Sequence, residues 1–264
     1  MTNRFSELLP LRPLGDDRFV VTPPGTGFLF GGLSMAAILK CAAATVDPAM
    51  TPMSLHATFL SNGDWGGPHD LEVVRVNDSR NFAVRSIHMV TSGRLAIVAE
   101  AVFQQREAGV DWQAVQRPDY PAPETLRAFQ PERLPFRVID IRPVFPQPEG
   151  TERVHPYWCR TLERLDDPGL LACALAFISD YWVYATPFPS GSGASEGLMS
   201  RTFSHTLVFH RPLPADSWWL FDCDPLSVCG GRFLSRGVVQ APDGLLLASF
   251  VQEGVIREDK RLNL

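Results

Sequence analysis

The sequence predicts an α+β protein built from two similar halves, in each of which an antiparallel β-sheet wraps around one central helix. Three observations predict this architecture: an apolar helix-like segment in each half, four strand-like runs after each segment, and residues that recur at a nearly fixed offset of about 150 positions. A long segment that is present twice indicates a duplicated domain. With 264 residues, the chain is long enough for two domains with a sizeable buried core.

The two helix-like segments are apolar on every side. The first spans residues 31–46, where Lys40 is the one charged residue, and the second spans residues 168–180. A helix without a polar stripe must be surrounded by protein rather than lie on a surface. This argues against the alternative architecture, an α+β sandwich with its helices on one exposed face. The small residues in both segments also predict that another element packs closely against each helix.

Strand-like runs follow each helix in the same order. They cover residues 53–61, 69–77, 80–91 and 94–104 in the first half and residues 201–211, 217–224, 231–241 and 245–256 in the second. The residues that match between the halves are His56 and His205, Phe82 and Phe233, Arg85 and Arg236, and Gly93 and Gly244. Ser92-Gly93 and Asp243-Gly244 are typical of hairpin turns. One helix wrapped by an antiparallel sheet, present twice, is a double hotdog.

A proline-rich stretch separates the two halves. Eight prolines lie within residues 117–150. Because proline fits neither the interior of a helix nor a central strand, this stretch is expected to be a connector, with one short strand at residues 136–141. The expected organisation is therefore an N-terminal hotdog at residues 1–116, a connector at residues 117–150 and a C-terminal hotdog at residues 151–264.

Composition argues against several classes of function. The net charge of −5 argues against a nucleic-acid-binding protein, which needs a basic face. The longest apolar stretches are shorter than the roughly 20 residues of a membrane span, and the N-terminus shows no targeting segment. The five cysteines include no CxxC pair, so we expect buried free thiols in a reducing compartment, most simply the cytoplasm.

Metal and cofactor motifs are also missing from the sequence. The six histidines are scattered without ligand spacing, so no metal site is expected. The sequence contains no glycine-rich loop followed by a lysine, so a bound nucleotide is not predicted. A GxSxG string at residues 193–197 lacks the strand before and the helix after that a nucleophile elbow needs. We therefore expect a Gly/Ser-rich loop there and do not expect Ser195 to be a nucleophile.

Asp180 is a carboxylate in apolar surroundings at the end of the second helix-like segment. Burial and the negative end of its own helix both raise the pKa of such a carboxyl, which suits a general base near neutral pH. Gln252 and Glu253 likewise interrupt the apolar last strand, and one of them must face inward because successive side chains face opposite ways. The structural alternatives stay open: Asp180 pointing to water, and a polar pair on an edge strand.

Thr202 lies on the strand that begins at Arg201. It shares one face of that strand with Ser204, and His205 is expected to face the other way. Threonine is common in strands, so its presence alone carries little functional weight.

Four stretches resemble the acyl-CoA thioesterase II family, whose members are double hotdogs. They are FGG at residues 30–32, SLH with FL within residues 54–60, AFISD at residues 176–180, and a C-terminal run that includes HTLVFHRP at 205–212 and SFVQEG at 249–254. The similarity covers nearly the whole chain and is weakest in the connector. It implies an enzyme that hydrolyses acyl-CoA to a free acid and CoA, without a cofactor, and that pairs into homodimers or larger assemblies.

The resemblance also implies an active site. In this family an Asp, a Thr or Ser, and a Gln orient the hydrolytic water, and by motif they fall on Asp180, Thr202 and Gln252. Thioester hydrolysis by such a set needs no covalent nucleophile, because Asp180 takes the proton of a water that the other two residues hold.

Further residues are candidates for binding the substrate. The backbone N–H groups of Gly31 and Gly32, near a helix start, are candidates for stabilising the developing oxyanion. Arg201, Arg232 and Arg236 are candidates for binding the phosphates of CoA, although a solvated surface is an equally good interpretation of each.

Two positions depart from the family pattern. Ser204 stands where the family usually has Asp, and Leu33 stands where the first-half motif often has Gln. Either change is expected to retune the substrate or to weaken catalysis. Two other functions therefore stay open: a non-catalytic acyl-CoA-binding hotdog protein, and a hotdog hydratase or dehydratase on acyl thioesters. The second needs a catalytic His beside the Asp, whereas His205 is expected to face away from Thr202.

Overall fold

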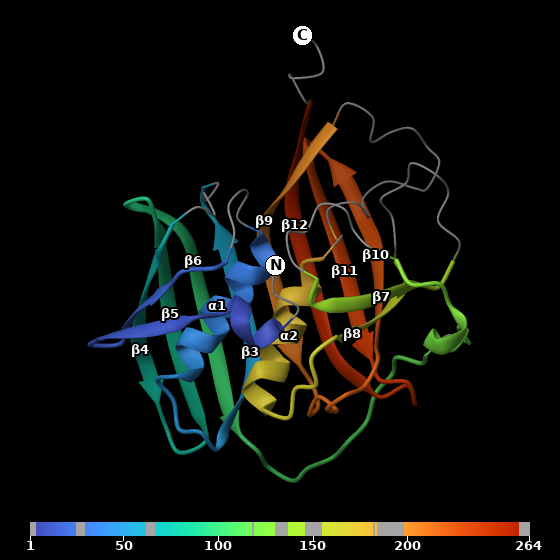
Figure 1. The fold of residues 1–264 in the computed structure, drawn as a ribbon, viewed down its shortest axis with the longest axis horizontal. Coiled ribbons are helices and arrows are strands. Elements are labelled where there is room, and N and C mark those ends of the chain that lie inside the picture. The colour runs from blue at the N-terminus through green and yellow to red at the C-terminus, as the bar shows by residue number, and fades with distance from the viewer. Residues whose placement is uncertain are drawn as a thin grey trace.

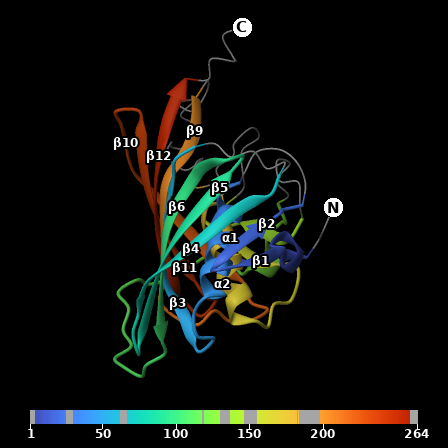
Figure 2. The same cartoon turned by 90° about the vertical axis from the view of Figure 1, so that its left-hand side faces the viewer.

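The fold is one curved antiparallel sheet with two helices side by side against it (Figures 1 and 2). The computed structural model describes residues 4–24, 30–61, 67–117, 119–129, 137–145, 155–181, 183 and 198–258. The helices are α1 (Gly31–Ala43) and α2 (Pro168–Ser179), and two short 3₁₀ helices span Phe5–Leu8 and Pro123–Thr125.

Twelve strands make up the sheet. In the first half they are β1 (Leu11–Gly15), β2 (Arg18–Val21), β3 (Met50–Phe59), β4 (His69–Asp78), β5 (Phe82–Thr91) and β6 (Arg94–Gln105). In the second half they are β7 (Ile139–Pro143), β8 (Tyr157–Thr161), β9 (Leu198–Phe209), β10 (Trp219–Cys229), β11 (Arg232–Gln240) and β12 (Leu246–Glu258).

The order of the strands repeats between the halves. From edge to edge it is β1-β2-β4-β5-β6-β3-β9-β12-β11-β10-β8-β7, so each half contributes six strands and the halves meet where β3 pairs with β9. Leu55 of β3 and Leu207 of β9 are partners at this seam, and both are fully buried. The predicted double hotdog is therefore confirmed.

All nine strands predicted from the sequence are present. Eight of them follow the two helices, and the strand expected at residues 136–141 forms as β7 at residues 139–143. The three strands that were not predicted, β1, β2 and β8, have only four or five residues each. Edge strands tolerate proline because one side makes no ladder hydrogen bonds, so Pro13 and Pro143 fit there.

Three of the four residue pairs matched between the halves are not structural equivalents. His56 is exposed whereas His205 is buried, and Arg85 is buried whereas Arg236 is exposed. Phe82 and Phe233 differ in the same way. A shift of one residue turns a strand side chain to the other face of the sheet, so the members of these pairs are one position out of structural register.

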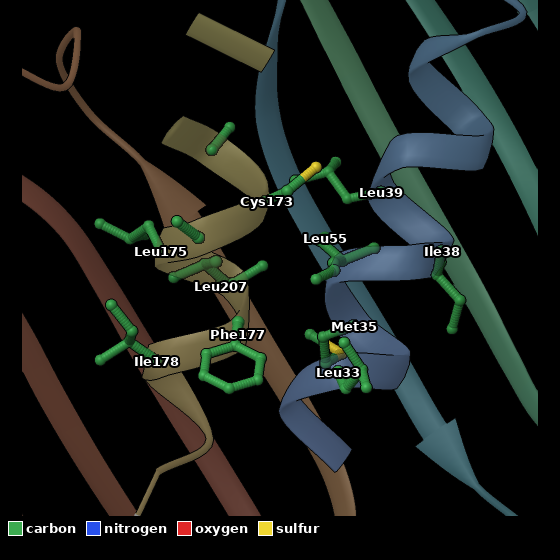
Figure 3. Close-up of a cluster of buried hydrophobic side chains, with 14 of the residues drawn as sticks. Leu33, Met35, Ile38, Leu39, Leu55, Cys173, Leu175, Phe177, Ile178 and Leu207 are labelled. Carbon is green, nitrogen blue, oxygen red and sulfur yellow. The ribbon is translucent and has the colours of Figure 1, made fainter. Parts of the chain in front are cut away.

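The helices are buried on all sides, as their apolar sequences predict. One hydrophobic core runs through both halves, and Figure 3 shows Phe177 of α2 directed toward Leu33 and Met35 of α1. The helices lie very close together at Gly32, where a Cβ atom would lie 2.2 Å from the carbonyl oxygen of Phe177. The small residues therefore allow the start of α1 to lie against the end of α2.

Candidate active site

Asp180 lies at the C-terminal cap of α2 and is 5% exposed. The hydroxyl of Thr202 donates to its Oδ1 over 3.2 Å, and the backbone N–H of Gly32 also donates to the carboxyl group. Burial raises the pKa of Asp180 to about 7, and these two hydrogen bonds oppose part of that rise. Near neutral pH, the side chain can therefore both accept and return a proton.

Gln252 connects this carboxyl group to the sheet. It lies on β12, next to β9, and its Nε2 donates to Oγ1 of Thr202 over 2.8 Å. The side chain is fully buried, while the next residue, Glu253, is exposed. Of the two polar residues in this strand, Gln252 is thus the one that faces inward. The structure brings Asp180, Thr202 and Gln252 into one hydrogen-bonded chain.

His205 also faces inward, and the expectation that it turns away from Thr202 is wrong. The pairing of β9 with β12 shifts between Ser204, which pairs with Glu253, and Thr202, which pairs with Gly254. The extra residue, Phe203, makes a β-bulge, and a bulge breaks the simple alternation of faces along a strand. As a result, Thr202 and His205 both contact the side chain of Gln252.

His205 extends the hydrogen-bonded chain on the side away from Asp180. Its Nδ1 lies 2.9 Å from Oε1 of Gln252, and its Nε2 lies 3.0 Å from the hydroxyl of Ser179. The ring is fully buried and stacks on Phe250, and burial lowers its pKa to about 4. This contact was not predicted from the sequence, because His205 points into the core only as a result of the bulge.

The start of α1 belongs to the site. The backbone N–H of Gly32 donates to the carboxyl group of Asp180, whereas stabilisation of the oxyanion by the start of α1 stays a prediction. Gly31 also lies near this carboxyl group, since a Cβ atom on it would lie 2.5 Å from Oδ2 of Asp180. Both glycines therefore allow a helix N-terminus to approach the carboxylate, where its partial positive charge favours the ionised form.

The other predicted binding residues lie elsewhere. Arg201, Arg232 and Arg236 are exposed, and each is adjacent in its strand to an inward-facing residue, so they occupy the outer face of the sheet. The structure does not bring them to Asp180, and their role in binding CoA stays a prediction. Ser195 lies outside the described residues.

The two residues that depart from the family pattern are Ser204, on β9, and Leu33, on α1. Ser204 points to the outer face, where its hydroxyl donates to Glu253 over 2.8 Å. Leu33 is buried in the core between the helices (Figure 3). Neither side chain forms part of the hydrogen-bonded chain that ends at Asp180.

Two features are absent from the described part of the chain. Its His, Cys, Asp and Glu side chains form no group that would hold a metal ion. Neither of its α-helices is long and apolar enough to cross a membrane.

Comparison with known proteins identifies the family. Residues 107–256 match the family model for the acyl-CoA thioesterase C-terminal domain, and residues 21–104 match that for the N-terminal domain. The chain is 29% identical to human acyl-coenzyme A thioesterase 8 over 95% of its own length and 88% of that protein. It is 27% identical to acyl-CoA thioesterase 2 of Haemophilus influenzae over 97% of both chains.

A solved structure agrees with these matches. The acyl-CoA thioesterase II of Mycobacterium marinum superimposes with a TM-score of 0.82 at 29% identity, covering 96% of this chain and 97% of that one. Two family models that together span most of the sequence, and a shared fold over nearly its whole length, show that the chain belongs to the acyl-CoA thioesterase II family of thioester hydrolases.

Proposed function

We propose that this protein hydrolyses acyl-CoA to a free acid and CoA, with Asp180 as the general base. The observation that carries the proposal is the hydrogen-bonded chain from Gln252 through Thr202 to a buried Asp180 whose pKa is raised to about 7. Such a carboxylate takes up a proton near neutral pH, as a base that activates water must. Membership of the thioesterase family supports the choice of an acyl-CoA substrate.

In the first step, a water molecule beside Asp180 loses a proton to the carboxylate as its oxygen attacks the thioester carbon. Thr202 and Gln252 hold that water against the carbon, which removes much of the entropic cost of attack. The Gln252 amide has two N–H groups, and one of them donates to Thr202. We assign the second to the water or to the developing oxyanion.

In the second step, the tetrahedral intermediate collapses. The C–S bond breaks, the free acid forms, and the thiolate of CoA takes the proton back from Asp180. The start of α1 is the second candidate for stabilising the oxyanion. The first N–H groups of a helix have no partner within the helix, and Gly31 is the first residue of α1. No covalent intermediate is needed.

The decisive test is Asp180→Asn, assayed by release of the CoA thiol from acyl-CoAs of short to long chain. The variant retains an oxygen to accept from Thr202 but cannot take a proton, so turnover should fall by roughly 10²–10⁴-fold. The exposed Asp166→Asn serves as the matched control and should retain wild-type turnover. Wild-type turnover in the Asp180 variant would contradict the assignment of the base.

The same assay separates the two other functions that the sequence left open. A non-catalytic binding protein would bind acyl-CoA without releasing the thiol. A hydratase or dehydratase would consume or form an enoyl thioester without releasing the thiol. His205 faces the site, but its Nδ1 contacts Gln252 and its Nε2 contacts Ser179, so neither ring nitrogen contacts Asp180. This favours hydrolysis over a hydratase or dehydratase activity.

A further inference from the structure

The buried imidazole of His205 touches the catalytic chain at one point, the carbonyl oxygen of Gln252. The distance from Nδ1 to Oε1 is 2.9 Å. An amide oxygen only accepts hydrogen bonds, so Nδ1 must carry a proton. Because burial lowers the pKa of His205 to about 4, the ring is neutral near pH 7 and Nε2 must then be an acceptor.

Ser179 lies at that nitrogen. Its hydroxyl donates to the carbonyl oxygen of Ala176 over 3.0 Å, and its oxygen lies 3.0 Å from Nε2 of His205. A hydroxyl has one proton, so the Nδ1–H tautomer is set by Oε1 of Gln252, which can only accept. Every hydrogen bond from His205 through Gln252 and Thr202 then runs in one direction, and the chain ends on Asp180.

The opposite tautomer would reverse the middle of this chain. A lone pair on Nδ1 would face the lone pairs of Oε1, and the Gln252 amide would have to rotate so that its nitrogen faced His205. Its oxygen would then face Thr202, whose hydroxyl would donate to it and no longer to Asp180. A neutral histidine has one N–H, and its environment selects which nitrogen carries it.

We infer that His205 is a positioning residue for thioester hydrolysis: through its Nδ1–H it fixes the orientation of the Gln252 amide and so directs the hydroxyl of Thr202 to Asp180. The inference rests on the proposed function, because it assigns Gln252 and Thr202 to the water. His205 joins the proposed catalytic residues as a supporting residue that does not itself touch the reacting atoms. The amide oxygen of Gln252, which can only accept, selects the tautomer.

Two substitutions separate this role from simple packing. In Asn, the amide nitrogen is bonded to Cγ, as Nδ1 is in histidine, so His205→Asn retains a donor toward Gln252. His205→Gln fills more of the cavity but moves its donor toward Ser179. If packing alone mattered, Gln would be the better replacement, whereas a positioning role predicts the reverse order.

The experiment measures kcat, KM and thermal unfolding for both variants, with the exposed His210→Gln as a control. We expect His205→Gln to lose roughly 10–100-fold in kcat with little change in KM, as when a supporting partner of a reactive group is removed. His205→Asn should stay within a few-fold of wild type. Equal losses in both variants, or losses that follow their melting temperatures, would overturn the inference.

A second readout does not depend on activity. In protein labelled with ¹⁵N-histidine, NMR should show His205 as the Nδ1–H tautomer. An Nε2–H tautomer in the wild type would overturn the inference. If the wild type releases no CoA, the proposed function itself fails, whereas normal kcat in His205→Gln beside an inactive Asp180→Asn refutes only the role of His205.

Discussion

Replacing Asp180 with asparagine should change how the stability of the protein depends on pH. The pKa of Asp180 rises from its ordinary value of 3.8 to about 7, chiefly because the folded protein buries the carboxyl group. Since one pKa unit corresponds to about 1.4 kcal/mol, ionising this side chain costs the folded state about 4 kcal/mol. The wild type bears this cost at high pH, and the variant does not.

The sign follows from proton binding. Between pH 3.8 and about 7, the folded state binds the proton of Asp180 more tightly than the unfolded state does, so the contribution of this group to stability decreases as the pH rises. It is largest at low pH and is lost above about pH 7. From about pH 5 to about pH 8, the free energy of unfolding of the wild type should fall by roughly 2.5 kcal/mol relative to Asp180→Asn.

The assay is urea unfolding of both proteins, followed by tryptophan fluorescence at several pH values. All other titrating groups are common to the two proteins and cancel in the difference, as does any constant effect of losing the Gly32 hydrogen bond. Asp166→Asn, with an exposed side chain, should run parallel to the wild type. A difference between wild type and Asp180→Asn that stays constant across this range would refute a raised pKa and the burial argument behind it.

Three further outcomes are expected. The kcat/KM of the wild type should rise with pH and level off above about 7, because Asp180 must be ionised to act as a base, and a rate independent of pH between about 5 and 8 would contradict this. Gly31→Ala should reduce turnover by about 10²-fold, because its Cβ would lie 2.5 Å from Oδ2 of Asp180, whereas Gly109→Ala, with nothing within 4 Å, should have no effect on the same assay. Ser195→Ala should leave turnover within a few-fold of wild type and organophosphonates should not inhibit; labelling of Ser195 with loss of activity would revive a serine nucleophile.

Sequence patterns predicted the central strands and both helices because burial imposes a periodicity on them. The runs at β5 and β12 alternate over ten or more residues, and α2 is apolar on every side. The short outer strands β1, β2 and β8 have too few residues to show a pattern. Their pairing depends on the neighbouring strand, which lies far away in the sequence.

The site was predictable in part. Asp180 and Gln252 stood out because polar side chains in apolar segments need partners, and both have them. The inward orientation of His205 was not predictable, because strict alternation placed it on the outer face and the bulge at Phe203 is a feature of the pairing between two strands. The contact of Gly32 with Asp180 depends on how the two halves dock, which no local pattern encodes.

Because of that contact, the covalent linkage of the two halves affects how the proposed site is assembled. Gly31 and Gly32 come from the first half, whereas Asp180, Thr202 and Gln252 come from the second, so neither half alone contains the complete site. If the halves were separate polypeptides, the fraction of assembled sites would depend on protein concentration. One continuous chain holds them at an effective concentration in the millimolar range or above. Each chain therefore carries all five residues of the proposed site at any dilution.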